Sequence, residues 1–98
     1  MNSRHCQDAM LLHAINRILL KEWDPLGIKN RPFMRDEYEE YLPRIFELLC
    51  ENAESSDIFE YLWRVETKVL ELQGDKAHTL NIAKALKQLQ TEHNLTQR

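Results

Sequence analysis

Apolar residues recur every three or four positions along most of this 98-residue chain, which is the spacing of one face of an α-helix. The pattern covers four stretches, at residues 7–22, 36–52, 55–73 and 75–90. The chain contains only 2 Gly and 3 Pro, whereas a sheet of hairpins needs such turn residues at every reversal. Residues 1–98 are therefore predicted to form one all-α domain, a compact bundle of about four helices with mostly antiparallel neighbours.

The first connection carries a clear stop signal. Pro25 has no amide donor and disfavours helical geometry in the residue before it, and Gly27 permits a left-handed turn. We expect the first helix to end here and a loop to run to about Arg35. Three apolar side chains should attach this loop to the core: Trp23, Ile28 and Phe33.

Pro43 lies inside the second helical stretch, where a proline removes one backbone hydrogen bond and clashes with the preceding turn. Two arrangements are compatible with it. Either a short turn over residues 36–41 precedes a helix that begins near Leu42, or one helix is kinked at Pro43. The sequence pattern fits both.

The last two helices have polar boundaries. The hydroxyl of Ser55 or Ser56 is suited to cap the third helix, because it can accept an amide hydrogen bond in the first turn. Gly74 is expected to end that helix, and the fourth helix is expected to start near Asp75. From about Thr91 the chain is polar, and we expect this tail to fray.

The composition is that of an ordinary globular protein, with 43% hydrophobic and 30% charged residues. Cys6 and Cys50 lie far apart and form no metal-binding pattern, so we expect two buried or half-buried thiols in a reducing cytosol. The first apolar stretch, residues 10–20, is too short and too polar to span a membrane. The sequence therefore predicts a cytoplasmic protein that does not bind membranes.

Charge is distributed unevenly. The formal net charge is −3, yet residues 1–35 carry +3, residues 36–66 carry −8 and residues 67–98 carry +2. Two interpretations of the acidic middle remain open: a solvated outer face of the bundle, or a surface that steers a cationic partner. Under the second interpretation five side chains supply most of the negative electrostatic field: Asp36, Glu37, Glu40, Glu47 and Glu51.

The basic residues are scattered along the chain. Recognition of phosphates needs a dense Lys/Arg patch, so this distribution disfavours nucleic acid as the ligand. Three lysines of the last helix are expected to pair with the acidic middle inside the bundle: Lys76, Lys84 and Lys87.

No motif for chemistry is present. The four histidines show no metal-ligand spacing, and the chain has no Gly-rich phosphate loop or nucleophile turn. The carboxylates have no calcium-loop pattern. We therefore expect no enzyme activity, no cofactor and no metal site. A hydrolase remains a third alternative, and it requires an Asp/Glu or Cys/His cluster to converge in a pocket.

Most aromatic residues should belong to the core, because aromatics at helical spacing usually do. Tyr61 and Trp63 flank the apolar stripe of the third helix instead of continuing it. Trp and Tyr dominate the energetics of interfaces, so Trp23, Tyr38, Tyr61 and Trp63 are candidate contact residues beside the carboxylates. Of these, Tyr38 and Trp63 are the predicted anchors.

The chain contains three short motifs: Glu22-Trp23-Asp24-Pro25-Leu26-Gly27-Ile28, then Asp36-Glu37-Tyr38 with Tyr41 and Pro43-Arg44-Ile45, then Tyr61-Leu62 with Val65-Glu66-Thr67. These motifs resemble a pattern shared by a group of small bacterial helical proteins whose activity is not known. The pattern reads roughly W-D-P-[ILV]-G, D-E-Y-x-x-Y and Y-L-x-x-[IV]-E-T, and the resemblance covers residues 15–72.

In size, acidity and helical content the chain is also similar to immunity proteins that neutralise bacterial toxins. That likeness is one of class, not of residues. It implies an inhibitor that binds a basic toxin domain or another cationic protein directly. The alternative is a regulatory or structural adaptor that associates with a second copy of itself.

Overall fold

Four α-helices with short 3₁₀- and π-helical extensions make up the regular structure of the described residues. The computed structural model describes residues 8–28 and 36–97, with side chains described for residues 9–28 and 36–92. Within these ranges every regular element is helical, which confirms the predicted all-α class. The elements are α1 (Asp8–Ile18), η2 (Leu19–Trp23), η4 (Glu39–Tyr41), α2 (Leu42–Cys50), α3 (Ser55–Arg64), η5 (Val65–Val69) and α4 (Lys76–Gln97).

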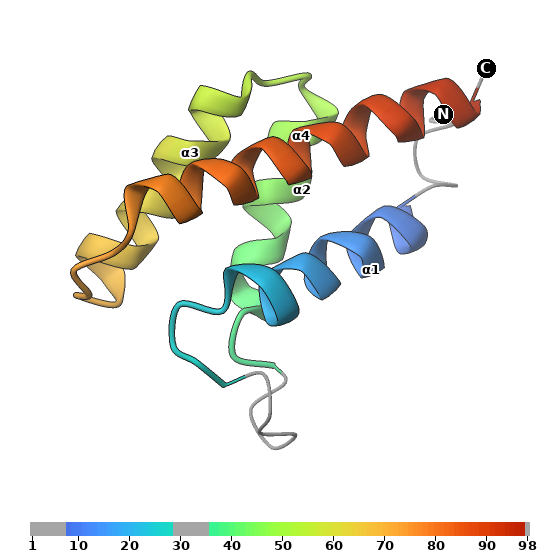
Figure 1. The fold of residues 1–98 in the computed structure, drawn as a ribbon. Helices are drawn as coiled ribbons and strands as arrows, with labels where there is room; N and C mark the ends of the chain where they lie inside the picture. The colour runs from blue at the N-terminus through green and yellow to red at the C-terminus, as the bar shows by residue number, and fades with distance from the viewer. Residues whose placement is uncertain (1–7, 29–35, 98) are drawn as a thin grey trace.

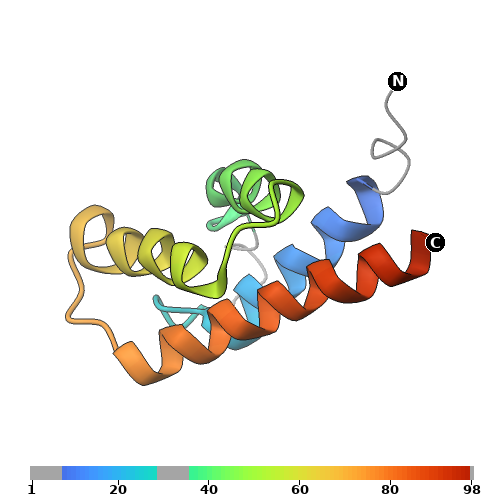
Figure 2. The ribbon, with the colours of Figure 1, turned by 90° about the horizontal axis from the view of Figure 1, so that it is seen from above.

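Helix α4 is the element around which the others assemble, because it contacts α1, α2 and α3. Figures 1 and 2 show α1 and α4 side by side and antiparallel, with α3 running back along α4 and α2 crossing behind it. Seen from above, α1 and α4 form one layer and α2 and α3 form the other (Figure 2). Within the described residues no helix combines the length and apolar character that a membrane span requires.

The core lies between these layers and follows the predicted helical spacing. Each α-helix, counted together with η2 for α1, contributes a pair of buried apolar residues four positions apart, as one helix face requires. The pairs are Ile15 and Leu19, Ile45 and Leu49, Ile58 and Leu62, and Ile82 and Leu86. Full burial of such a side chain is worth about 1.5–3 kcal/mol, so these four pairs account for much of the packing.

The first helix ends where the sequence predicted. Its last turn is π-helical (η2), and Asp24 then adopts a left-handed conformation with φ 34°. Gly27 is left-handed as expected, with φ 68°. Trp23 and Ile28 are buried and attach the loop to the core, whereas Phe33 lies outside the described residues.

The alternatives at Pro43 are resolved in favour of two elements. A 3₁₀ turn, η4, precedes α2, and Pro43 lies in the first turn of α2. An amide in the first turn of a helix has no intrahelical acceptor, so the missing N–H of proline costs little there. The chain therefore continues without a kinked helix.

The predicted cap of the third helix is wrong. Neither Ser55 nor Ser56 caps α3; Glu54 does so, in a capping box with Asp57. The backbone N–H of Glu54 donates to Asp57 Oδ2 at 3.1 Å, and the Glu54 side chain accepts from the amide of Asp57. Two carboxylates three residues apart thus replace the hydroxyl that the sequence favoured.

The predicted end of the third helix is also wrong. Helix α3 passes into the π-helical η5, which ends at Val69, and Glu71 is already left-handed with φ 57°. Gly74 lies beyond this end, in the connection to α4. The start of α4 agrees with expectation, because Asp75 Oδ1 accepts from the His78 amide at 3.2 Å. Helix α4 extends to Gln97, and fraying of its tail stays a prediction.

Candidate functional site

The two π-helical segments bring a tryptophan and a glutamate together. Trp23 is the last residue of η2 and Glu66 is the second residue of η5. Across 43 residues of sequence, Trp23 Nε1 donates a hydrogen bond to Glu66 Oε2 at 2.5 Å. Single π-helical turns are rare and occur frequently at functional sites. Because the two π-helical segments meet at this contact, this part of the molecule is a candidate functional site.

Glu66 is a buried acid with only 3% of its surface exposed. A second donor, the buried hydroxyl of Thr79, also reaches Oε2 at 2.5 Å. None of the hydrogen bonds between described residues reaches the other oxygen, Oε1. The ion pair found in the described part of the chain joins Arg44 to Glu47, away from Glu66. Two neutral donors on one oxygen therefore offset part of the cost of burying this acid.

The remaining motif, which contains Tyr38 and Tyr41, meets the other two at the same place. The Tyr38 hydroxyl donates to Asp24 Oδ1 at 2.9 Å and accepts from the amide of Leu26 at 3.0 Å. The rings of Tyr38 and Tyr41 lie 5.5 Å and 6.2 Å from the Trp23 ring, between centroids. We call the group Trp23, Asp24, Tyr38, Glu66 and Thr79 the junction. All three motifs contribute to it.

Tyr38 is fully buried, which corrects the prediction that it anchors a partner. An aromatic ring with one polar atom is buried readily when that atom finds a partner, as this hydroxyl does. Burial raises the pKa of the Tyr38 phenol above its usual range, and the hydrogen bond to Asp24 acts in the same direction. Trp23, also named as a contact candidate, is buried for the same reason.

A pocket of about 330 Å³ opens beside the junction. It lies between the loop after η2 and the connection that leads into α4. Four ionisable residues and two apolar residues dominate its walls: Asp24, Glu66, Asp75, His78, Pro25 and Leu72. The Nε2 atom of His78 lies 3.3 Å from the carbonyl oxygen of Trp23.

Gly74 completes the wall of this pocket. A Cβ atom at this position would lie 2.7 Å from Trp63 Cζ3 and 3.1 Å from Glu66 Oε1. Its φ of 80° is also a conformation that favours glycine. The absence of a side chain therefore leaves room for both neighbours and places Glu66 Oε1 next to the pocket.

The predicted acidic residues lie on the surface. All nine carboxylates of residues 36–60, which we call the acidic segment, are exposed, including Asp36, Glu37, Glu40, Glu47 and Glu51. Asp36, Glu37 and Glu40 lie at or just before η4, Glu47 lies on α2, and Glu51 is the residue that follows α2. Glu47 forms an ion pair with Arg44 at 2.9 Å. The expected solvent exposure is thus present, with one pair neutralised locally.

A depression of about 430 Å³ brings part of the acidic segment together between α2 and α3. Its charged lining consists of Arg44, Glu51, Asp57, Glu60 and Arg64. Tyr61 lines it as well, and its pKa is raised, mainly by burial, while the neighbouring Arg44 acts to lower it. Carboxylates of α2 and α3 therefore share one surface with the two arginines of this region.

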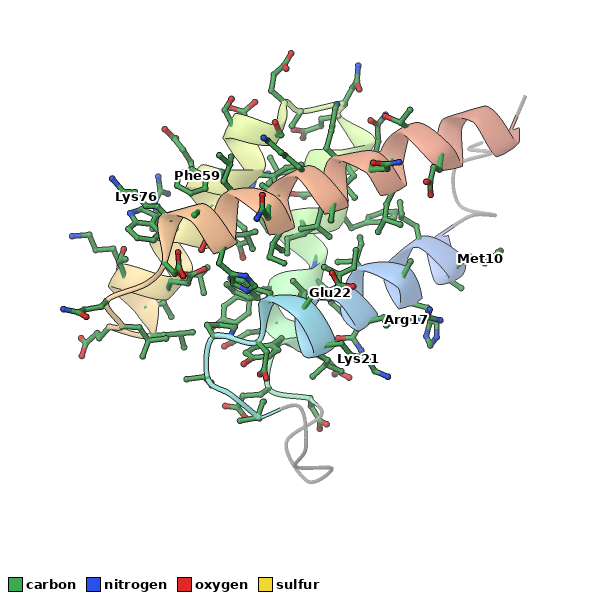
Figure 3. All side chains as sticks on the ribbon, viewed as in Figure 1. Met10, Arg17, Lys21, Glu22, Phe59 and Lys76 are labelled. Carbon is green, nitrogen blue, oxygen red and sulfur yellow. The ribbon has the colours of Figure 1, made fainter. Side chains whose placement is uncertain are left out.

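Trp63 does not line this depression. Two residues along a helix are separated by about 200° of rotation, so Trp63 and Tyr61 lie on different sides of α3. Trp63 stacks on Phe59 with centroids 5.8 Å apart, and Lys76 Nζ lies 5.7 Å from the centre of its ring. Phe59 and Lys76 project from neighbouring parts of α3 and α4 in Figure 3. The predicted anchor Trp63 is therefore half-buried and separate from the acidic depression.

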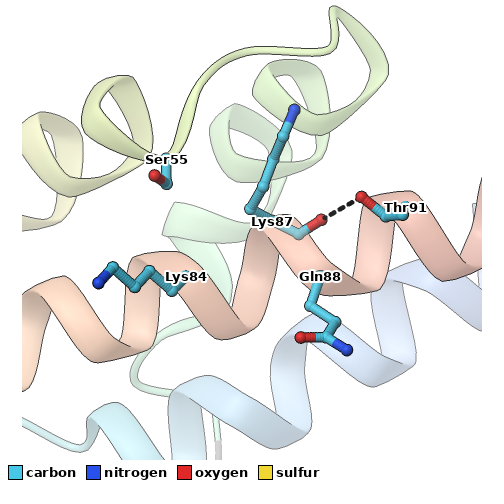
Figure 4. Close-up of a pocket in the computed structure, with 5 residues that line it drawn as sticks. All are labelled: Ser55, Lys84, Lys87, Gln88 and Thr91. Atoms are coloured by element: carbon cyan, nitrogen blue, oxygen red, sulfur yellow. Dashed lines mark hydrogen bonds between the residues drawn. The ribbon is translucent and has the colours of Figure 1, made fainter.

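Two of the three α4 lysines contact other groups than the sequence suggested, since Lys76 lies over the Trp63 ring and Lys87 bonds to the connection before α3. Lys87 Nζ donates to Asn52 Oδ1 at 3.0 Å and to the carbonyl oxygen of Ala53 at 2.7 Å. Figure 4 shows Lys84 and Lys87 beside Ser55 and Thr91, in a groove of about 310 Å³ along α4. Between described residues neither of these lysines forms an ion pair with the acidic segment.

The sequence analysis missed Glu66 and Thr79 of the junction, and it also missed Gly74 and His78 of the pocket beside it. One signal was available, because Glu66 follows Leu62 and Val65 on the apolar stripe, where a charge is unusual. In the described part of the chain no group of three or more His, Cys, Asp or Glu residues has the geometry of a metal site. Cys50 is exposed, which corrects the expectation of a buried or half-buried thiol.

The fold and the site define a small all-α protein with a hydrogen-bonded buried acid on one side and an exposed acidic surface on another. No protein-family model, curated protein or solved structure matches the chain. The resemblance of the three motifs to small bacterial helical proteins, and the class likeness to immunity proteins, therefore stay predictions.

Proposed function

We propose that this protein is an immunity- or antitoxin-type inhibitor that binds directly to a cationic toxin domain or another basic protein. The observation that carries the proposal is the exposure of all nine carboxylates of the acidic segment. Solvated carboxylates of one sign raise the rate of encounter with a basic surface and orient it.

The separation of charge between the two layers supports this proposal. The layer of α2 and α3 holds the acidic segment. In the other layer Arg17 and Lys21 are exposed, whereas Lys76, Lys84 and Lys87 lie where α4 meets α3 and the connection before it. Arg17 and Lys21 project from α1 away from α4 in Figure 3. The electrostatic attraction of a basic partner orients such a molecule so that α2 and α3 face that partner on encounter.

The depression between α2 and α3 is the contact surface that we favour. Glu51, Asp57 and Glu60 offer acceptors for lysine or arginine side chains, and Tyr61 offers a half-buried aromatic ring. Tyrosine is enriched among the residues that dominate binding energy. Tyr61 thus takes the place that the sequence analysis gave to Tyr38 and Trp63.

Affinity capture from a lysate of the source organism, at low and at high salt, tests the proposal. We expect a basic protein to be captured at low salt and released at high salt, since the attraction between exposed charges is screened. Mass spectrometry of the eluate identifies it. Recovery of only the protein itself, unchanged by salt, would contradict the proposal and favour a self-associating adaptor.

Two matched variants then locate the contact surface. Glu51→Lys, in the depression, is expected to slow association with the captured partner several-fold and to reduce its salt dependence. Glu22→Lys makes the same change of charge at η2, next to α1, where Figure 3 shows the side chain. Equal effects of the two variants on the association rate would contradict the assignment of the surface.

A further inference from the structure

The pocket beside Glu66 combines negative charge with partial enclosure. Asp24, Glu66, Asp75 and His78 line it, and no lysine or arginine is among its described lining residues. Pro25 and Leu72 supply apolar wall. A concave site of this kind excludes some water and strengthens attraction for a cation. The pocket lies apart from the depression between α2 and α3, so ligand binding here is independent of the proposed inhibitor function.

Glu66 provides an acceptor that the fold itself does not use. The side chain is 97% removed from solvent, because only 3% of its surface is exposed, and both described donors bind Oε2. Oε1 receives no hydrogen bond from a described residue and lies beside Gly74 at the pocket wall. Oε1 is not among the fully enclosed atoms without a partner, so it is open to the pocket, and an N–H group that enters there can reach it and donate to it.

The number of acceptors favours a planar ligand with several donors. Asp75 stands at the start of α4 and is exposed, while Glu66 lies at the base of the pocket. A guanidinium group carries several N–H donors in one plane and can bind two carboxylates at once, whereas an ammonium group acts as a point charge. Guanidinium is also weakly hydrated, which suits a pocket whose wall includes Pro25 and Leu72.

We propose that this pocket binds a guanidinium group, with Glu66 Oε1 as the acceptor at its base and Asp75 as the acceptor at its rim. The group belongs either to a small guanidino compound or to an arginine side chain of a protein or peptide. Both sources present the same chemistry to the pocket.

Ethylguanidinium is the probe for a first test on the full chain. The protein has 2 tryptophans, so its two indole N–H signals are readily followed by ¹H–¹⁵N NMR. We expect a saturable shift of the Trp23 signal, because its N–H donates to Glu66, and a smaller change at Trp63. N-ethylurea has nearly the same shape without the charge and is expected to cause no saturable shift. Absence of a shift with ethylguanidinium, or an equal response to N-ethylurea, overturns the proposal without any variant.

Glu66→Gln tests the role of Oε1. The carbonyl oxygen of glutamine can still accept from Trp23 and Thr79, while its amide group replaces Oε1 with a donor. We expect affinity for ethylguanidinium to fall about tenfold or more, as loss of a hydrogen bond to a charged group requires. Glu71→Gln removes an exposed carboxylate of the same connection that does not line the pocket, and it is expected to leave affinity unchanged. Unchanged affinity in folded Glu66→Gln would overturn the assignment.

Two further titrations identify the ligand class. Ethylammonium is expected to bind more weakly than ethylguanidinium, and tighter binding of the ammonium ion would refute the guanidinium assignment. An acetylated tripeptide amide Gly-Arg-Gly distinguishes the sources. Tighter binding of this peptide than of ethylguanidinium assigns an arginine side chain, and binding of ethylguanidinium alone assigns a small guanidino compound.

Discussion

The junction and the acidic segment use the same chemical group in opposite ways. In the junction one acid, Glu66, is withdrawn from water and held by the Trp23 indole and the Thr79 hydroxyl. In the acidic segment nine carboxylates stay in water, and between described residues one of them, Glu47, forms an ion pair. The difference teaches that position relative to the core, not charge itself, decides what an acidic residue contributes.

The energetic consequences of the two settings differ in size. A buried polar group that loses a partner costs about 1–3 kcal/mol, and more when it is charged. An exposed ion pair contributes about 0–1 kcal/mol, since water solvates both charges and salt screens them. Substitutions in the junction should therefore lower the free energy of unfolding, whereas substitutions in the acidic segment should change binding and leave the fold intact.

Trp23→Phe is the substitution with the largest expected effect. It removes a donor to the buried Glu66 and part of a ring that is packed against Tyr38 and Tyr41. We expect the free energy of unfolding, measured with urea, to fall by about 4 kcal/mol. Trp63→Phe is the control, because its ring is half-buried and makes no hydrogen bond to Glu66, and we expect a loss of about 1 kcal/mol. Equal losses would mean that the contact between Trp23 and Glu66 stabilises little.

Gly74→Ala tests the closeness of the junction to the connection before α4. The added Cβ atom would meet Trp63 at 2.7 Å, and φ is 80°. We expect a loss of about 2–3 kcal/mol in the free energy of unfolding, from backbone strain and crowding together. At Gly27, φ is 68° but no atom lies within 4 Å of the added Cβ. Gly27→Ala should therefore lose only about 1 kcal/mol, from the backbone alone. A smaller loss at Gly74 than at Gly27 would argue against the crowding seen there.

The helices could be predicted from the sequence because their signal is local. Four-residue spacing of apolar residues gave the pairs that fill the core, and Gly27 gave the left-handed turn. The capping of α3 was less predictable, since Ser55 and Glu54 both offer oxygen acceptors and only the backbone geometry selects between them. The helical structure that continues α3 ends at Val69 in a π-helical segment, and the spacing of apolar residues does not predict such a segment.

The junction could not be predicted because its contacts are distant in sequence. Trp23 and Glu66 are 43 residues apart, and Tyr38 and Asp24 are 14 residues apart. Helical spacing says which residues face inward, but not which inward polar atoms meet. The exposure of the acidic segment was predictable, since carboxylates in numbers rarely lose their water. Tyr38 was predicted to anchor a partner because tyrosine dominates interface energetics, but its ring is buried and its hydroxyl bonds to Asp24 instead.

The raised pKa values of the tyrosines allow the burial of Tyr38 and Tyr41 to be tested by changing the pH. Burial raises the pKa of Tyr41 to about 12, with the nearby Glu40 acting in the same direction, and burial raises the pKa of Tyr38 further. The pKa of Tyr61 is also raised. Unfolded tyrosine has a pKa of about 10, so between pH 10 and 12 the unfolded chain releases protons that the folded chain keeps.

The stabilisation from these phenols is thus complete below pH 10 and is lost as pH rises toward the folded pKa values. We expect the denaturation midpoint in urea to fall steadily between pH 10 and 12. Ultraviolet titration of the 3 tyrosines should show little ionisation at pH 10 before unfolding begins. Tyr41→Phe should flatten the decline. A midpoint that does not change over this range would contradict the burial of Tyr38 and Tyr41.

The smallest effect on stability is expected in the acidic segment. Glu47→Gln removes the ion pair with Arg44, whose two side chains are both exposed, and Glu51→Gln removes a carboxylate that no described cation pairs with. Both variants should stay within about 0.5 kcal/mol of the parent free energy of unfolding. Raising the salt concentration should reduce even this difference, because the attraction in the pair is screened.

A loss above about 1 kcal/mol in the free energy of unfolding of either variant, measured with urea at low salt, would mean that these carboxylates stabilise the bundle. The distinction between a structural junction and a solvated binding surface would then fail, because the acidic segment would also be structural.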